Sequence, residues 1–255
     1  MAVVALASAA GSPGVTTTAL GLAFSWPRPV LLVEADPTGS SGILAGFFRG
    51  TREYDAGLIE LALAPAGVAD AVAEVARPVE GSSVSFIAGT RSHVQVAGLR
   101  ELWAPLSQAL ADLDTTGQDV IVDAGRLGLT GSPEPLLNAA DLALLVTRTS
   151  LPALAAARSW AQTVRRPDSG WRRAGALLVG EGQPYRAGEV SKVLGLPVVA
   201  SLPDDPEAAA VYHRGAPPPR RFESGQYARG LLAAVESIRA CVARSRSELL
   251  EGVSP

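Results

Sequence analysis

The alternation of two kinds of segment constrains the fold of this chain more than any other feature of its sequence. Short apolar runs rich in Val, Ile and Leu alternate with longer stretches rich in Ala and Leu. Most of the short runs are continuously apolar, as strands that are buried on both faces are. This order predicts an α/β fold: a mainly parallel sheet of about seven or eight strands with helices on both faces.

The expected elements follow one another along the whole chain. The strands are predicted at Val3–Ala7, Val30–Glu34, Val84–Ala88, Val120–Asp123, Leu142–Thr147, Ala176–Val179 and Val198–Ser201. The helices are predicted at Thr17–Phe24, Ala69–Ala76, Gly98–Leu113, Leu151–Val164, Gly188–Leu194, Glu207–His213 and Gln226–Leu250. Neither an internal repeat nor a second core is visible, so we expect a single domain spanning residues 1–255.

Composition and charge restrict the classes of function. The chain is 47% hydrophobic and 18% charged, which is typical of a globular protein with a large core. Its net charge of −3 gives no general attraction to nucleic acid or anionic lipid. Cys241 is the only cysteine, no apolar run reaches membrane-spanning length and Met1–Ala10 lacks a basic leader, so we expect a cytoplasmic protein. Lys192 is the only lysine.

A glycine-rich turn links the first expected strand to the first helix. Residues 9–19 read AAGSPGVTTTA, with hydroxyl residues where the helix begins. Backbone N–H groups in such a turn, together with a helix N-terminus, form a site for an anion.

This turn resembles the variant Walker motif of the ParA/MinD family of P-loop ATPases, which reads Lys-Gly-Gly-x-Gly-Lys-Thr-Thr. Gly11, Gly14, Thr16 and Thr17 match the motif. The resemblance implies a Rossmann-like P-loop fold. It also implies that the loop contacts the phosphates of ATP, through Gly11, Ser12, Gly14, Val15, Thr16 and Thr17.

The same turn departs from the motif at the positions of its charges. Ala10 stands where the family has its intermolecular lysine, Val15 where it has its phosphate-binding lysine, and Ser12 where it has a glycine. Since charge-assisted contacts are about twice as strong as neutral ones, we expect ATP and Mg²⁺ to bind weakly. Arg126 and Arg148, each following a strand, are the candidates that could replace the lysine.

A second motif follows the second strand. Residues 30–39 read VLLVEADPTG and resemble the family's Asp-x-Asp-Pro-x-Gly element, with Glu34 in place of the first aspartate. The resemblance implies that Asp36 is the catalytic or water-positioning carboxylate and a Mg²⁺ ligand. The alternative is that Asp36 only caps the turn, as Asp-Pro often does.

The third motif, residues 119–125, reads DVIVDAG and resembles the family's Walker B strand. Asp123 takes the magnesium-linked position, so the implied metal ligands are Thr16, Asp36 and Asp123. Apolar runs that end in Asp are common, and the value of this one lies in its order after the first two motifs.

The later half resembles members of the family that serve pilus assembly and septum-site placement, in residues 140–154 and 194–206. ATP-binding relatives read the adenine with an asparagine after the strand that corresponds to Ala176–Val179. Here that strand leads into Gly180-Glu181-Gly182, which lacks the asparagine.

Other charged groups carry weaker hypotheses. His93 and His213 have no second ligand at metal spacing, so no zinc site is expected. Three arginine pairs are interpreted first as solvated charge and second as a DNA-facing patch; these are Arg165-Arg166, Arg172-Arg173 and Arg220-Arg221. The C-terminal helix carries Glu248 and Glu251 where a membrane anchor would carry lysines, so no direct membrane insertion is expected.

These features favour a ParA/MinD-like positioning or scaffold protein with impaired or absent ATPase activity. Its expected partners are proteins of a pilus, secretion or septum-site system, and a homodimer is expected. The alternatives are an active Mg-ATP-dependent ATPase with a rebuilt phosphate site, and a segregation protein that binds DNA nonspecifically.

Overall fold

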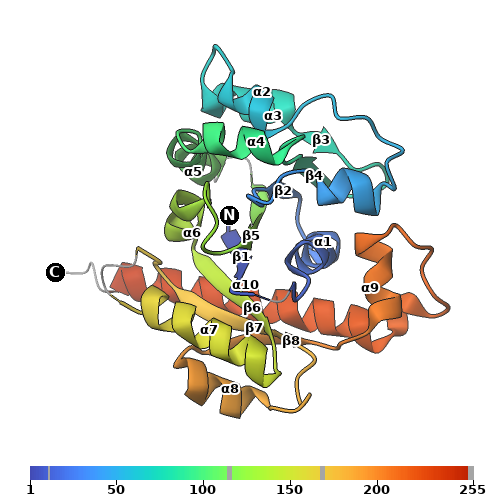
Figure 1. The fold of residues 1–255 in the computed structure, drawn as a ribbon, viewed down its shortest axis with the longest axis vertical. Helices are drawn as coiled ribbons and strands as arrows, with labels where there is room; N and C mark the ends of the chain where they lie inside the picture. The colour runs from blue at the N-terminus through green and yellow to red at the C-terminus, as the bar shows by residue number, and fades with distance from the viewer. Residues whose placement is uncertain (11, 114–116, 167–169, 252–255) are drawn as a thin grey trace.

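The computed structural model describes residues 1–10, 12–113, 117–166 and 170–251. In these residues an 8-stranded sheet has the order β3-β4-β2-β5-β1-β6-β7-β8 (Figure 1). The strands are β1 (Val3–Ser8), β2 (Val30–Glu34), β3 (Arg77–Pro78), β4 (Val84–Ile87), β5 (Asp119–Arg126), β6 (Leu142–Arg148), β7 (Ala174–Val179) and β8 (Val198–Leu202). Every neighbouring pair is parallel except β3 and β4. The expected mainly parallel sheet is therefore confirmed.

Helices cover both faces of the sheet. They are α1 (Val15–Ser25), α2 (Leu58–Ala62), α3 (Val68–Val75), α4 (His93–Val96), α5 (Trp103–Asp112), α6 (Glu134–Ala139), α7 (Leu151–Val164), α8 (Ala187–Leu194), α9 (Pro206–His213) and α10 (Gln226–Glu251). Figure 1 shows α1 on one side of the central strands and α5 and α6 on the other. Two hydrophobic clusters result, one under α1, α9 and α10 and one under α3, α5, α6, α7 and α8.

The central strand β1 shows why the sequence folds this way. All six of its residues are buried. Val4 and Leu6 enter the cluster under α1, and Ala5 and Ala7 enter the other cluster, because successive side chains of a strand point to opposite faces. The continuous apolar run in the sequence is thus the signature of burial on two sides.

One expected helix begins later than predicted. The prediction was Gly98–Leu113, whereas α5 begins at Trp103 after a 3-10 turn over Ala97–Leu99. Pro105 explains this start, because proline has no N–H and is tolerated in the first turn of a helix but not in its interior.

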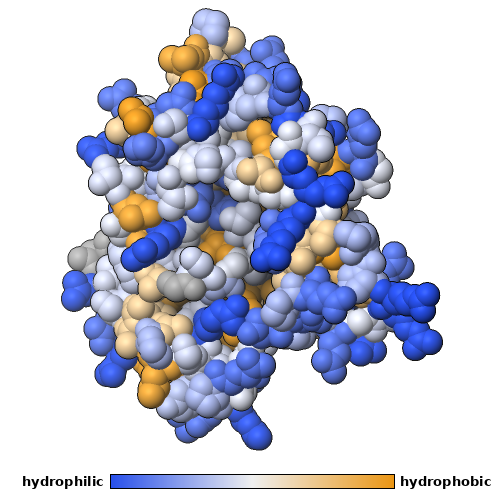
Figure 2. Space-filling model, turned by 45° about the vertical axis from the view of Figure 1, so that its right-hand side comes forward, coloured by the Kyte–Doolittle hydropathy of each residue, from blue (hydrophilic) through white to orange (hydrophobic). Residues whose placement is uncertain are grey.

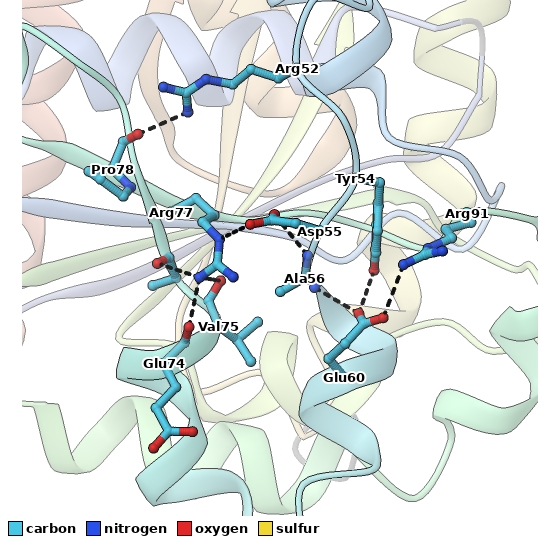
Figure 3. Close-up of polar contacts among 12 residues, drawn as sticks. Arg52, Tyr54, Asp55, Ala56, Glu60, Glu74, Val75, Arg77, Pro78 and Arg91 are labelled. Carbon is cyan, nitrogen blue, oxygen red and sulfur yellow. Dashed lines mark hydrogen bonds and ion pairs between the residues drawn. The ribbon is translucent and has the colours of Figure 1, made fainter.

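The sequence prediction missed short elements that lack a full period. These are β3, α2, α4, α6 and a π-helical turn over Ile43–Phe47. At the β3 edge of the sheet, side-chain contacts rather than a long periodic element fix the position of the chain (Figure 3). Arg77 forms an ion pair with Asp55 at 2.7 Å and donates to the last carbonyls of α3, including Glu74 O at 2.7 Å.

Apolar side chains on the surface are scattered. On the face drawn in Figure 2 they form separate spots among polar residues. The most exposed large ones are Leu63, Val94 and Leu151, at 76%, 73% and 66% exposure. They belong to different segments, which follow or begin α2, α4 and α7.

Candidate nucleotide site

A cavity of about 580 Å³ opens at the carboxyl ends of the central strands. This volume is within the range of small-molecule sites. It is bounded by the turn between β1 and α1, by the ends of β5, β6, β7 and β8, and by α9 and the start of α10. In an open parallel sheet, ligands bind outside the carboxyl ends of the strands. The cavity is therefore where this fold places a ligand.

The turn between β1 and α1 contains two described residues with a left-handed backbone. Gly14 has φ of 94° and Ser12 has φ of 45°, both in the left-handed region. That conformation costs a non-glycine residue about 1–2 kcal/mol, and Ser12 adopts it at a position where the ParA/MinD motif has a glycine. Gly11 lies outside the described residues.

The N-terminus of α1 faces this cavity without an acceptor of its own. No side chain caps the helix, and its first turn contains no acidic residue. Val15, Thr16 and Thr17 begin the helix and line the cavity. Unpaired N–H groups and the helix dipole make such an end attractive to an anion.

The residues at the two lysine positions bring no charge to the cavity. Val15 is 7% exposed and packs into the hydrophobic cluster under α1, although it also lines the cavity. Ala10 is half-buried and is not part of the lining. Lys192 lies exposed on α8, away from the lining residues.

Asp123 is the buried carboxylate of the site. Its exposure is 0%, Oδ1 accepts a hydrogen bond from the Gly125 N–H at 3.0 Å, and no described residue gives Oδ2 an aligned donor. Burial raises the pKa of Asp123 to about 7; the nearby Thr16 hydroxyl opposes the shift, and the charges of Asp36 and Glu34 add to it. A buried carboxylate oxygen without a donor is placed to bind a cation.

Asp36 caps its turn and also lines the cavity. Its Oδ1 accepts from the Thr38 N–H at 2.9 Å, which is the turn-capping contact. It also lines the cavity and packs so closely on Gly125 that a Cβ there would collide with the carboxylate. Glycine at position 125, with φ of 60°, therefore lets the β5 turn approach Asp36.

Glu34 is not a ligand-facing residue, and its alignment with the first aspartate of the family motif carries no site role here. It is 2% exposed and accepts hydrogen bonds from Ser41 Oγ at 2.5 Å, Gly89 N at 2.8 Å and Ile43 N at 3.0 Å. Burial raises its pKa, and these donors oppose the shift. Glu34 instead ties the chain after β2 to the chain after β4.

The two arginines singled out from the sequence differ in their partners. Both line the cavity. Arg148 forms an ion pair with Asp204, with Nη1 and Oδ2 2.5 Å apart. Arg126 is exposed, and its side chain makes no hydrogen bond or ion pair with any described residue.

Sequence reasoning missed part of the lining. Asp204 comes two residues after the end of β8, as Asp36 does after β2, so the rule that singled out Asp36, a carboxylate after a parallel strand, would have found it. Tyr227 and His213 come from α10 and α9 and carry no such signal. The His213 ring is held by the Ala209 carbonyl at 2.9 Å.

The weaker charge hypotheses involve residues on separate elements. Arg165 and Arg166 follow α7, whereas Arg173 precedes β7 and forms an ion pair with Glu248 at 2.6 Å. Within the described ranges, no group of three or more His, Cys, Asp or Glu side chains could hold a metal ion. No helix in that part of the chain is long and apolar enough to cross a membrane.

The residues present fit a magnesium nucleotide. Mg²⁺ is commonly bound by one or two carboxylates together with phosphate oxygens, so it does not need a protein cage. Asp123 and Asp36 would supply the carboxylates and Thr16 the hydroxyl, while the turn and α1 would hold the phosphates. Bound Mg²⁺ would neutralise phosphate charge and polarise the terminal phosphoryl group.

Strand order, crossover helix and loop together define a Rossmann-like P-loop fold, and this is the fold of the MinD and ParA ATPases. The cell division ATPase MinD of Pyrococcus furiosus superimposes with a TM-score of 0.74 at 20% identity, covering 94% of this chain and 98% of that chain. The Mg-ADP complex of the septum site-determining protein MinD of Pyrococcus horikoshii gives 0.74 at 18% identity, covering 96% and 98%. The MinC:MinD complex of Aquifex aeolicus gives 0.73 at 13% identity, covering 94% and 96%.

In sequence, the chain is similar to uncharacterized proteins from two strains of Mycobacterium tuberculosis. Each is 30% identical over 232 residues, which cover 84% of this chain and 58% of the relative. The match thus spans little more than half the length of these relatives. No protein-family model matches the chain.

Proposed function

We propose that this chain is a ParA/MinD-type positioning or scaffold protein whose nucleotide site binds Mg-ATP weakly and hydrolyses it slowly or not at all. We further propose that residues 1–255 act as one domain. The fold supports the positioning role, since its solved neighbours include cell division and septum-site proteins.

One observation carries the proposal for the site. The uncapped N-terminus of α1 lines the cavity, and the buried Asp123, whose Oδ2 has no donor among the described residues, is hydrogen-bonded to Gly125 of the lining; yet valine and alanine stand at the two lysine positions. These features support a phosphate site that lacks the charge of the family's lysines. One missing charge-assisted contact is worth about 1.5–3 kcal/mol, which puts the dissociation constant on the order of 0.1 mM or weaker.

The absence of a lysine at position 10 bears on assembly. In the resembled family, that lysine reaches the phosphates of the partner subunit and couples dimerisation to nucleotide. Ala10 has no group that can do this. Any homodimer of this chain should therefore form independently of ATP, and its surface would be available to proteins of a pilus, secretion or septum-site system.

The test combines mass and turnover. Multi-angle light scattering of the purified chain, with and without Mg-ATP, should give one mass distribution, and a phosphate-release assay should show little or no turnover above buffer. A dimer that forms only with Mg-ATP, or rapid ATP turnover, would contradict the proposal and favour a working ATPase.

A further inference from the structure

The described part of the cavity holds more negative than positive side chains. Asp36, Asp204 and Asp205 line it, against Arg126 and Arg148. Arg148 is already neutralised by Asp204. Arg126 is thus the one arginine of the described lining whose charge no described carboxylate offsets. A phosphate entering this cavity has one unpaired cation to meet.

The position of Arg126 in the sheet brings it close to the loop. It is the last residue of β5, three positions after Asp123, and its register partner on β1 is Ser8. The Leu127 N–H donates to the Ser8 carbonyl at 2.9 Å and the Ser8 hydroxyl donates to the Gly125 carbonyl at 3.4 Å, so the chain is held on both sides of Arg126. Since the glycine turn begins directly after Ser8, the backbone of Arg126 is fixed beside the start of that turn.

We propose that Arg126 supplies the phosphate-binding charge that Val15 cannot, from the strand next to the loop rather than from the loop itself. The inference rests on the proposed function, because it concerns the same site. It goes further in naming the ligand chemistry and its receptor: the terminal phosphates of a nucleoside polyphosphate, bound by a guanidinium.

Two other features of the site agree with this placement. The uncapped α1 N-terminus offers neutral N–H donors to the phosphate, and the completely buried Asp123 lacks a donor at Oδ2, where a phosphate-bound Mg²⁺ would be held. A guanidinium can contact two phosphate oxygens at once, whereas a lysine ammonium acts as a point charge. One arginine can therefore replace part of the lost charge.

The test measures Mg-ATP binding by calorimetry for four proteins: wild type, Arg126→Gln, Arg126→Lys and Arg158→Gln. Arg158→Gln removes the same charge from an exposed site on α7 outside the cavity. Arg126→Gln should weaken binding about tenfold or more, the loss of one charge-assisted contact. Arg126→Lys should stay within about threefold of wild type and Arg158→Gln within about twofold.

The double variant Val15→Lys/Arg126→Gln separates a lost charge from a damaged site. It should regain at least the wild-type affinity, because a charge returns to the family's own position. Thermal melts of all variants show whether they are folded.

Different results would overturn the inference about Arg126 and the proposed function. If a folded Arg126→Gln protein binds Mg-ATP as tightly as wild type, the inference is overturned and the proposed site stands. If wild type shows no binding with Mg-ATP at about 5 mM, the proposed function fails and the role of Arg126 fails with it.

Discussion

Arg148, the last residue of β6, and Asp204, two residues after β8, form an ion pair in the wall of the cavity, with Nη1 and Oδ2 2.5 Å apart. The pair joins residues 56 positions apart in the sequence, and it neutralises one of the two arginines in the described lining. The side chains are 44% and 24% exposed, so solvent screens the pair and its contribution to stability is small. Its effect on the potential of the cavity is the larger consequence.

Removing the carboxylate of this pair should strengthen phosphate binding. Asp204→Asn releases Arg148 and takes a negative charge from the lining, so the affinity for Mg-ATP should rise about three- to tenfold. Glu207→Gln is the control, since it makes the same charge change at an exposed residue of α9 outside this lining. Equal affinities in a calorimetric titration of both variants would contradict the prediction.

Asp123→Asn should make the protein more stable at pH 8 while weakening its Mg-ATP binding. The folded-state pKa of Asp123, about 7, lies above the ordinary value. The folded state therefore holds the proton more tightly than the unfolded state, and this group makes stability fall as the pH rises from about 4 to 7.

An asparagine carries no charge, so the variant should show a flatter pH dependence over that range and gain about 1–3 kcal/mol at pH 8. Urea unfolding at pH 5 and pH 8 measures both effects. If the variant is less stable than wild type at pH 8, the Asp123 carboxylate stabilises the fold and is not a ligand held ready for a cation.

Gly14→Ala should destabilise the protein by about 1–2 kcal/mol, because φ of 94° is unfavourable for a residue with a Cβ. It should also weaken Mg-ATP binding by moving the N-terminus of α1. Gly188→Ala in α8 is the matched control, with no neighbour within 4 Å of the added Cβ, and should be neutral or stabilising by up to about 1 kcal/mol. Similar chemical denaturation curves for the two variants would count against the left-handed turn.

Glu34→Ala should cost about 2–4 kcal/mol of the free energy of unfolding. The substitution leaves the Ser41 hydroxyl and the N–H groups of Gly89 and Ile43 without their acceptor in a buried place. Glu53→Ala, at an exposed position, should change stability by less than about 0.5 kcal/mol. If the free energies of unfolding of the two variants differ by less than about 0.5 kcal/mol, Glu34 does not stabilise the chain around the site.

Much of the fold was predictable from the sequence because its strands are continuous apolar runs. Val30–Glu34 was predicted with the observed bounds, as was the helix Leu151–Val164. The short helices α2, α4 and α6 were not, since four to six residues contain too little of a helical period. These helices are fixed by contacts distant in sequence, such as the Leu58 N–H on the Ala88 carbonyl at 3.0 Å.

The sequence predicted that two carboxylates would lie near each other at the ends of strands, but it did not predict the balance of charge in the cavity. Asp36 follows β2 and Asp123 lies near the end of β5, close enough for the charge of Asp36 to raise the pKa of Asp123. The difference between Arg126 and Arg148 could not be seen, because it depends on a carboxylate after β8 that pairs with one of them. The role of Glu34 depends in the same way on donors from two other segments.

The measurement that tests the central claim most directly is Mg-ATP binding by wild type and Val15→Lys. We propose that the loop is a formed phosphate site that lacks only the charge of the lysine found at position 15 in the ParA/MinD motif. Val15 is 7% exposed but lines the cavity, so a lysine stem could occupy the buried position of the valine while its ammonium reaches the cavity. A folded Val15→Lys protein should bind Mg-ATP at least about tenfold more tightly than wild type, a gain of ~1.4 kcal/mol. No gain in a variant whose thermal melt shows it is folded would contradict the account, because the loop would then be built for something other than phosphate.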